Sequence, residues 1–285
     1  MPPTTLPPIT LIVATTPVPS PNAPARLGIG LNGTLPWPRI KTDMSFFARV
    51  TARLPLPGSA STSSTTGTAT ATGKTRTNAV IMGRKTYDSI PLKLRPLGKR
   101  VNVVISRDDD GGVTRRVSEE LEGKVGRERD LAAAKAKANA GVEVQQTTAS
   151  APAPALTSAV PEGQTDAFVS SSLESALKTL DESVSKDEVG HIYIIGGAEI
   201  YASSLKIDDG RKVRIVMTDV EKVDGGAFEC DTYFPLDGGV LGGDEGEGWR
   251  KVGAEEVSGW VGEEVGGEWV VEGDVRVRMV GYERG

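Results

Sequence analysis

Residues 28–47 read Gly-Ile-Gly-Leu-Asn-Gly-Thr-Leu-Pro-Trp-Pro-Arg-Ile-Lys-Thr-Asp-Met-Ser-Phe-Phe, and this stretch decides how the rest of the chain is interpreted. A turn-rich loop ends at residues 35–38, and helical periodicity over residues 40–53 predicts a helix whose apolar stripe consists of Ile40, Met44, Phe47 and Val50. Asp43 lies in the first turns of that helix, among apolar neighbours. Because a carboxylate is costly to bury, an acid at this position indicates a bound ligand.

The composition excludes several classes of function. The chain of 285 residues has a net charge of −5 and no basic tract, which argues against a nucleic-acid partner. No apolar run is long enough to span a membrane, and the first residues lack the pattern of a signal peptide, so we expect a cytoplasmic protein without a membrane partner. Cys230 is the only cysteine, which favours a reducing compartment.

Histidine chemistry is also restricted. His191 is the only histidine, and no cysteine or histidine pair has metal-ligand spacing, so we expect no metal site. His191 stands at the start of a predicted strand, where a structural role is favoured over a catalytic one. The chemistry must therefore rest on carboxylates, hydroxyls, backbone amides or a bound cofactor.

Short apolar, β-branched runs alternate with helical patterns along the chain. Strands are predicted at residues 9–14, 78–83, 101–106, 168–169, 191–195 and 212–218, and helices at 84–88, 172–180 and from 198 onward. Residues 15–27 read as a proline-rich connection. The patterns at 249–257 and 268–282 predict two further strands in a hairpin. This order predicts an α/β fold: a central, mostly parallel mixed sheet with antiparallel C-terminal strands, flanked by helices.

Three segments do not fit this pattern. Residues 54–77 and 108–165 read as low-complexity or disordered inserts, although good helix formers between 118 and 140 allow a peripheral helix. Residues 237–248 form an acidic, glycine-rich loop. We expect a single domain over residues 1–285 that contains these inserts.

The ends of three predicted strands carry groups suited to phosphate. They are Gly83-Arg84-Lys85-Thr86, Ser106-Arg107 and Gly196-Gly197-Ala198-Glu199. Ligands of open α/β sheets bind at the carboxyl ends of strands, where helix N-termini present free N–H groups. Taken singly, a Gly-Gly pair is more often a tight turn, and Arg-Lys at a helix start is more often a solvated face. Three such segments on one sheet favour a nucleotide ligand. The two separate arginines, Arg84 and Arg107, favour a nicotinamide cofactor that carries an additional phosphate.

Together these segments resemble dihydrofolate reductase. The order matches: an Ile-Val-Ala strand, Gly-Ile-Gly-x-Asn-Gly-x-Leu-Pro-Trp-Pro, an acid on the next helix, Ile-Met-Gly-Arg-Lys-Thr, Arg-Pro-Leu, Asn-Val-Val-Ile-Ser-Arg, Ile-Gly-Gly-x-x-x-Tyr and Asp-Thr-Tyr-Phe-Pro. The resemblance covers residues 9–14, 26–53, 78–107, 166–235 and about 249–283. It implies the single-domain fold of that family and a monomer.

The resemblance implies that NADPH reduces 7,8-dihydrofolate to tetrahydrofolate, in support of one-carbon metabolism and of thymidylate, purine and glycine synthesis. Hydride passes to pteridine C6, and a water-borne proton reaches N5. Asp43 matches the acid that binds the pterin, and burial should raise its pKa. Trp37 and Thr218 match residues that support this carboxylate and its water.

The other site residues are likewise implied by the resemblance. Arg100 matches the arginine that pairs with the α-carboxylate of the glutamate tail, although by itself it reads as a surface arginine. The remaining substrate contacts are Ile12, Val13, Met44, Phe47, Ile90, Leu94, Leu97, Ile195 and Tyr201, which by composition are simply core residues. The cofactor contacts are Ala14, Gly28, Ile29, Gly30, Asn32, Gly33, Thr34, Leu35, Gly83, Arg84, Lys85, Thr86, Ser106, Arg107, Ile195, Gly196, Gly197, Ala198, Glu199, Ile200 and Tyr201. The Gly196–Gly197 peptide is cis in this family.

Two alternatives stay open at this point. A related NADPH reductase of riboflavin synthesis shares the fold but lacks Leu-Pro-Trp-Pro followed by a helix acid, so Trp37 and Asp43 argue against it. A non-catalytic folate- or nucleotide-binding protein is the second alternative. It is favoured only by the connection at 15–27, which is longer than in compact members and corresponds to the loop that closes over the nicotinamide.

Overall fold

The computed structural model describes residues 6–54, 76–140, 164–185, 188–242 and 248–284. Most of the first predicted insert, residues 55–75, lies outside the described residues. So do residues 141–163 of the second insert and 243–247 of the glycine-rich loop. Among the described residues, no helix combines the length and the apolar character needed to cross a membrane.

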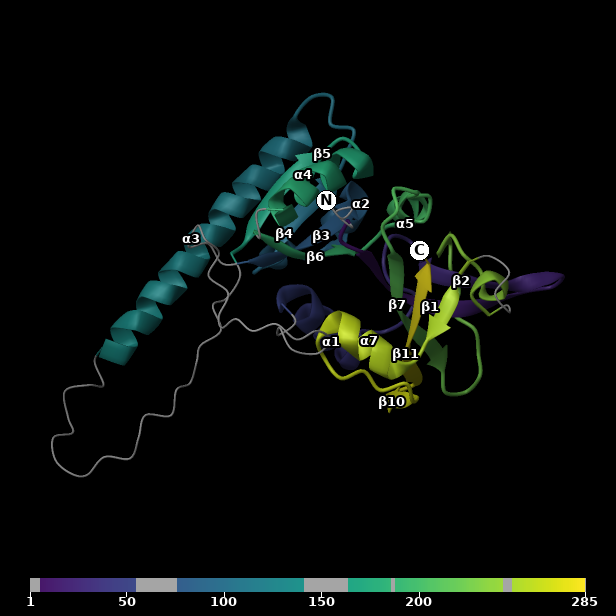
Figure 1. Ribbon diagram of the computed structural model, residues 1–285. Helices are drawn as coiled ribbons and strands as arrows, with labels where there is room; N and C mark the ends of the chain where they lie inside the picture. Colours follow the sequence, from purple (N-terminus) through teal and green to yellow (C-terminus); the bar gives the residue numbers. More distant parts are fainter. Residues whose placement is uncertain (1–5, 55–75, 141–163, 186–187, 243–247, 285) are drawn as a thin grey trace, which may run out of the picture.

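One mixed sheet organises the molecule (Figure 1). Its strands follow the order β10–β11–β7–β1–β6–β3–β4–β5. Their bounds are β1 (Ile9–Ser20), β3 (Thr77–Gly83), β4 (Val101–Ile105), β5 (Asp166–Ser170), β6 (Val189–Ile194), β7 (Val213–Lys222), β10 (Val270–Glu272) and β11 (Val275–Arg284). The pairs from β7 to β5 are parallel, whereas β11 is antiparallel to β7 and to β10. The predicted α/β architecture is therefore confirmed.

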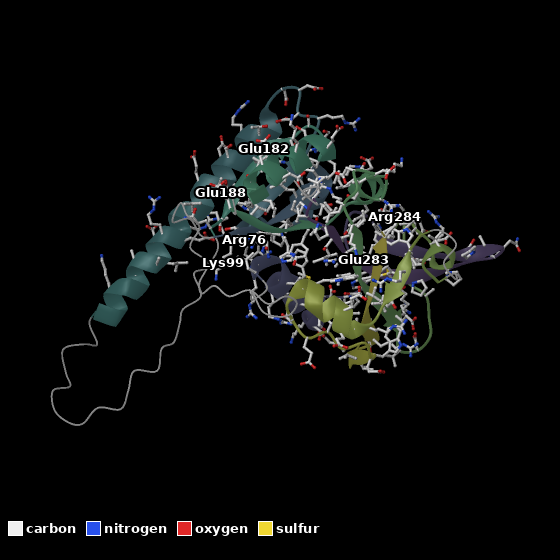
Figure 2. All side chains as sticks on the ribbon, viewed as in Figure 1. Arg76, Lys99, Glu182, Glu188, Glu283 and Arg284 are labelled. Carbon is white, nitrogen blue, oxygen red and sulfur yellow. The ribbon has the colours of Figure 1, made fainter. Side chains whose placement is uncertain are left out.

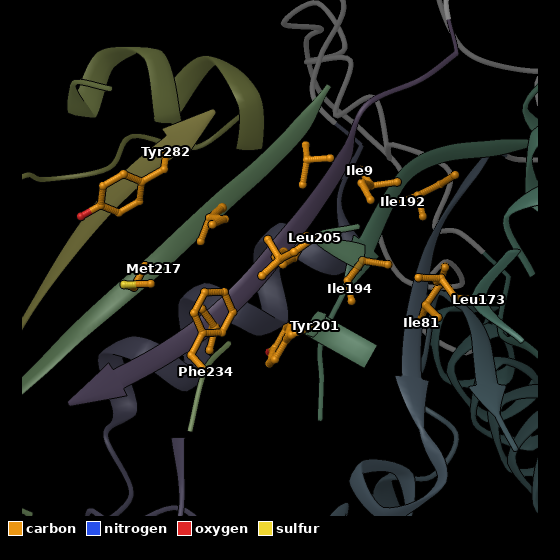
Figure 3. Packing of buried hydrophobic residues seen from close by; sticks show 14 of the residues in the cluster. Ile9, Ile81, Leu173, Ile192, Ile194, Tyr201, Leu205, Met217, Phe234 and Tyr282 are labelled. Atoms are coloured by element: carbon orange, nitrogen blue, oxygen red, sulfur yellow. The ribbon is translucent and has the colours of Figure 1, made fainter. Parts of the chain in front are cut away.

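Helices cover both faces of the sheet. On one face, α4 (Leu173–Ser185) and α5 (Ala198–Ser204) bury Leu177, Leu180 and Tyr201 against the strands. Figure 3 shows Leu173 and Tyr201 in this cluster. On the other face, α1 (Lys41–Ala52), α2 (Arg84–Ser89), α3 (Gly112–Ala140) and α7 (Ala254–Val261) contribute to a second buried cluster. Short η1 (Leu92–Leu94) and α6 (Gly238–Gly242) complete the helices. Two stacked layers on a central sheet are what alternating strand and helix patterns require.

The predicted stripe of α1 is only partly correct. Ile40 and Val50 are buried, but Phe46 takes the buried place expected of its neighbour Phe47, and Met44 is 38% exposed. Ser172 caps α4, because its Oγ accepts a hydrogen bond from the Ser175 N–H at 3.1 Å. Thr77, which was placed in an insert, belongs to β3.

The expectation of an irregular connection over residues 15–27 is wrong. β1 continues to Ser20, the chain turns, and β2 (Ala23–Gly30) returns antiparallel to it, with Thr16 opposite Gly28 and Val18 opposite Arg26. β2 also pairs with β8 (Thr232–Tyr233). Beyond Thr15, β1 pairs with β2 alone, and a proline that donates no N–H is tolerated on such an edge. The result is a two-stranded ribbon that projects from the body of the protein (Figure 1).

The C-terminal part also differs from the prediction. Of the strand expected over 249–257, only β9 (Arg250–Val252) is extended, and residues 254–257 begin α7. The hairpin instead joins β10 to β11, and β9 pairs with the far end of β11. Glu283 on β11 accepts hydrogen bonds from Lys212, Arg214 and Arg250, and it lies next to Arg284 (Figure 2). These ion pairs around the buried Glu283 carboxylate fasten β9 and β7 to β11.

Candidate active site

The carboxyl ends of the parallel strands meet where the sequence predicted a ligand. The Gly83 N–H, at the end of β3, donates to the Gly196 carbonyl at 2.8 Å. The Ile195 N–H, after β6, donates to the Ile81 carbonyl at 2.9 Å. The Gly196–Gly197 peptide between them is cis, as the resemblance implied.

The backbone approaches closely at the starts of α2 and α5. A Cβ atom on Gly83 would lie 3.2 Å from Cγ1 of Ile200, and one on Gly197 would lie 3.3 Å from Oγ1 of Thr86. Gly83 and Gly197 are also the N-cap residues of these helices, and neither provides a side-chain cap. The helix-terminal N–H groups are thus left for a ligand, and the lack of side chains lets that ligand come near the backbone. These features fit the phosphates of a dinucleotide.

Three cations stand at the same edge of the sheet. Arg84 and Lys85 open α2, Arg107 follows β4, and all three side chains are exposed. Ser106 lies between β4 and Arg107, and its N–H donates to the Ser170 carbonyl of β5 at 3.0 Å. Guanidinium groups in such positions match the geometry of a phosphate monoester. The sequence-predicted phosphate segments are therefore brought together.

Asp43 and Thr218 form the polar centre of the opposite side of the site. Oγ1 of Thr218, on β7, donates to Oδ1 of Asp43, on α1, at 2.7 Å. Burial raises the pKa of the Asp43 carboxyl above its ordinary value of 3.8, and the negative charge of Glu272 raises it further. The Thr218 hydrogen bond acts in the opposite direction. A carboxylate whose pKa is raised in this way can hold a proton closer to neutral pH.

The position of α1 is set by a residue that the sequence did not single out. Both oxygens of the Glu272 carboxylate, on β10, accept backbone N–H groups at the helix start: Lys41 at 2.6 Å and Thr42 at 3.0 Å. The Thr42 hydroxyl adds a third hydrogen bond of 2.7 Å. An acid at a helix N-terminus satisfies orphan donors and complements the helix dipole. Glu272 therefore fixes the first turn of α1, one residue before Asp43.

The apolar residues predicted to contact the pterin meet beside Asp43's helix. Ile12 is buried in the cluster on that face of the sheet, and packed against the cluster are the half-buried Phe47, Ile90, Leu97 and Ile195. Met44 and Leu94 are 38% and 45% exposed. Large apolar side chains left in solvent mark a surface that a ligand can cover. Val13, in contrast, packs in the cluster on the other face, so its side chain does not join this group.

Tyr201 and Trp37 are held by contacts within the protein. The buried Tyr201 hydroxyl donates to the Ile12 carbonyl at 2.7 Å, and its ring lies 3.2 Å from a Cβ built on Gly196. Trp37 packs edge-on against Phe228, with ring centroids 6.0 Å apart. Tyr201 thus links α5 to β1 directly below the Gly-Gly peptide. The support that Trp37 was expected to give to Asp43 stays a prediction.

The segment predicted to contact the nicotinamide runs along the ribbon and its exit. A Cβ on Gly28 would come within 2.3 Å of Sγ of Cys230, so only glycine fits there. Asn32, Gly33 and Thr34 form an exposed turn, closed by hydrogen bonds between Leu31 and Thr34. The Asn32 N–H donates to Oδ2 of Asp231 at 2.7 Å, which ties this turn to the start of β8. The nearby Leu35 side chain is 48% exposed.

Arg100 is a buried cation beside α1. It is only 7% exposed, and burial lowers the pKa of its guanidinium to about 10. Its Nη2 donates to the Ala48 carbonyl of α1 at 3.1 Å, whereas its buried Nε has no hydrogen-bond partner among the described residues. A buried, under-satisfied guanidinium next to α1 is suited to an anionic ligand. The reading of Arg100 as an ordinary surface arginine is therefore wrong.

The comparisons agree with this geometry. A sequence model of the family described as dihydrofolate reductase matches residues 69–140. Dihydrofolate reductase of Heliothis virescens is 29% identical over 73% of this chain and 73% of its own length. Those of Cryptococcus neoformans and Candida albicans are each 28% identical, over 97% and 87% of this chain and 92% and 86% of their own lengths. The acid, the Gly-Gly peptide and the strand order stand in the expected places, and the family match and these relatives support the identification of the chain as similar to the dihydrofolate reductases.

Proposed function

We propose that the protein reduces 7,8-dihydrofolate to 5,6,7,8-tetrahydrofolate with NADPH. The observation that carries this proposal is the Asp43–Thr218 pair, with a hydrogen bond of 2.7 Å between side chains from two different elements. Asp43 lies on α1, and the apolar face of this helix, which includes Phe47 and Met44, is left partly open to solvent. A flat heterocycle can pack on this apolar surface, and an amidine-like edge of the ring can donate two hydrogen bonds to the carboxylate.

Asp43 binds and orients the substrate. Its two oxygens can accept hydrogen bonds from the 2-amino group and N3 of the pterin, while Thr218 fixes the plane of the carboxylate through Oδ1. Burial raises the pKa of Asp43, so that a proton is available on this side of the ring. That proton reaches N5 through a water molecule, because the acid binds the opposite edge of the pterin.

Arg100 holds the other end of the substrate. The α-carboxylate of the glutamate tail would satisfy the orphaned Nε and offset the desolvation of the guanidinium. Its Nη2 is already fixed by the Ala48 carbonyl, so the fork is oriented before the substrate arrives. Binding energy from this remote tail can then position the pterin ring at the reacting edge.

The cofactor half of the site has its own set of groups. NADPH, when bound, supplies the hydride that reduces pteridine C6. The backbone at Gly83 and Gly196–Gly197 would hold its phosphates, with Thr86 between the two helix starts. Arg84, Lys85 and Arg107 would hold the phosphate on the adenosine ribose. The turn at Asn32–Thr34, after the end of β2, would exclude water from the nicotinamide.

The experiment that tests this function is the optical assay of NADPH oxidation with and without dihydrofolate. We expect turnover only when both are present, with one tetrahydrofolate formed per NADPH consumed. Asp43→Asn is the matched control, because it keeps the shape of the side chain but removes the acid. No turnover by the wild-type protein at saturating substrate would refute the proposal.

A further inference from the structure

Helix α3 begins directly beside one of the predicted cofactor arginines. Asp108, the residue after Arg107, caps the helix: its carboxylate accepts the Val113 N–H at 3.0 Å, the Thr114 N–H at 2.8 Å and the Thr114 hydroxyl at 2.8 Å. These hydrogen bonds lower the pKa of Asp108 to about 2, so the cap is charged throughout the physiological range. The start of α3 therefore fixes the backbone that carries Arg107.

The same helix is joined to α2, which carries the other predicted arginine. The Tyr87 hydroxyl donates to Oε2 of Glu120 at 2.6 Å. Nη2 of Arg116 donates to Oδ1 of Asp88 at 2.8 Å. Between these contacts, Val117 is 1% exposed and packs in the core. One face of the first turns of α3 is thus bound to α2, whereas the rest of α3 extends past the sheet with polar side chains in solvent (Figures 1 and 2).

Asp88 is the point at which three arginines compete. Arg95 and Arg116 approach its Oδ1 at 3.4 and 2.8 Å, and Arg84 approaches its Oδ2 at 3.6 Å, so Arg116 makes the shortest contact. Arg84 stands one helical turn before Asp88 and is half exposed. Without Arg116, the i,i+4 position would favour a closer pair between Arg84 and Asp88. That pair would draw the guanidinium of Arg84 along α2 and compete with a phosphate for it.

We propose that α3 positions the cofactor-binding arginines and that Arg116 determines the preference for the phosphorylated cofactor. By hydrogen-bonding to Oδ1 of Asp88, Arg116 offsets the charge of this carboxylate and keeps the Arg84 pair with Oδ2 long, so that Arg84 can turn to a phosphate monoester, while the Asp108 cap holds the backbone of Arg107. This inference rests on the proposed function only in its choice of cofactor. It assigns a role to a helix that the sequence read as a peripheral part of an insert.

The test is the affinity of the purified protein for NADPH and for NADH, measured by calorimetry without substrate. We expect Arg116→Ala to weaken NADPH about fivefold and to leave NADH unchanged, because only one of the two carries the extra phosphate. Arg115→Ala is the matched control: it is the adjacent arginine on the same helix, exposed to solvent, and it should change neither affinity. Thermal unfolding of each variant reports whether the fold is intact.

A second variant separates the electrostatic role from a merely structural one. In Arg116→Ala with Asp88→Asn, no carboxylate remains to draw Arg84 away, so the affinity for NADPH should return to nearly the wild-type value. Equal weakening of NADPH and NADH, or no recovery in the double variant, would overturn the inference. A wild-type protein that does not prefer NADPH would instead overturn the cofactor assignment of the proposed function, which the calorimetry reveals before any variant is made.

Discussion

Replacing Arg100 with methionine is expected to stabilise the fold and to weaken substrate binding at the same time. Burial lowers the pKa of Arg100 from its ordinary value to about 10. At about 1.4 kcal/mol per pKa unit, the charged side chain costs the folded state about 3 kcal/mol. The variant loses the hydrogen bond to the Ala48 carbonyl, worth about 1 kcal/mol. We therefore expect the free energy of unfolding at neutral pH to rise by about 2 kcal/mol.

The sign of this change in the free energy of unfolding depends on whether the folded or the unfolded state releases the guanidinium proton at lower pH. The folded state releases the proton at about pH 10 and the unfolded state only at higher pH, so the cost of the charge is complete below pH 10 and fades above it. Urea unfolding at neutral pH measures the change. A lower free energy of unfolding in the variant would refute the reasoning, because it would mean that contacts of Arg100 outweigh its desolvation.

Substrate binding provides the second readout for the same variant. Loss of a buried partner for the glutamate carboxylate costs about 2 kcal/mol or more, which raises the KM for dihydrofolate about 30-fold. The KM for NADPH should not change. The control substrate is 6-methyl-7,8-dihydropterin, which has no glutamate tail and should be reduced equally well by both proteins. An equal loss with both substrates would remove Arg100 from the tail site.

Three further changes concern the acid and its neighbours. Asp43→Asn should lose most of the reductase rate near neutral pH. The variant should nevertheless unfold at a higher temperature than the wild type above pH 3.8, because burial raises the pKa of the carboxyl and makes its ionised form costly. This gain in unfolding temperature should vanish well below pH 3.8, where the carboxyl is protonated in both states. Thr218→Val removes the hydrogen bond that lowers this pKa, so the alkaline limb of the pH–rate profile should move to higher pH. Glu272→Gln removes a charge that raises the pKa, so the same limb should move to lower pH. Shifts of Thr218→Val and Glu272→Gln in the same direction would count against this assignment of the profile to Asp43.

Local sequence signals were sufficient for the parallel strands and for the phosphate-suited segments at their ends. The strands before Gly83 and Gly196 were predicted because each apolar run is short and is followed at once by glycine. Thr218 and Asp43 were brought together through the resemblance, since nothing within either segment shows that β7 lies under α1. The structure supplies that contact as a hydrogen bond across 175 positions of the chain.

The errors have identifiable physical causes. Proline was taken as a sign of irregular structure over residues 15–27, but Pro17 lies in a strand with one free edge, where its missing N–H costs nothing. The role of Glu272 could not be foreseen, because it caps a helix 231 positions before it in the chain. Arg116 and Glu120 have the i,i+4 spacing of any solvated helix. Only the packing of α3 against α2 distinguishes them from their exposed neighbours.

The central position of β1 has a consequence for how the protein reaches its native state. Ile9 pairs with Ile192 on one side and with Val213 on the other, so the first strand of the chain has no neighbour close to it in sequence within the main sheet. Two-state proteins dominated by such non-local pairs fold on the order of milliseconds to seconds. The long inserts before β3 and before β5 lengthen the loops that must close, but each doubling of a loop costs only about 0.6 kcal/mol. We therefore expect deletions within residues 55–75 or 141–163 to change the refolding rate little, whereas weakening the docking of β1 should slow it markedly.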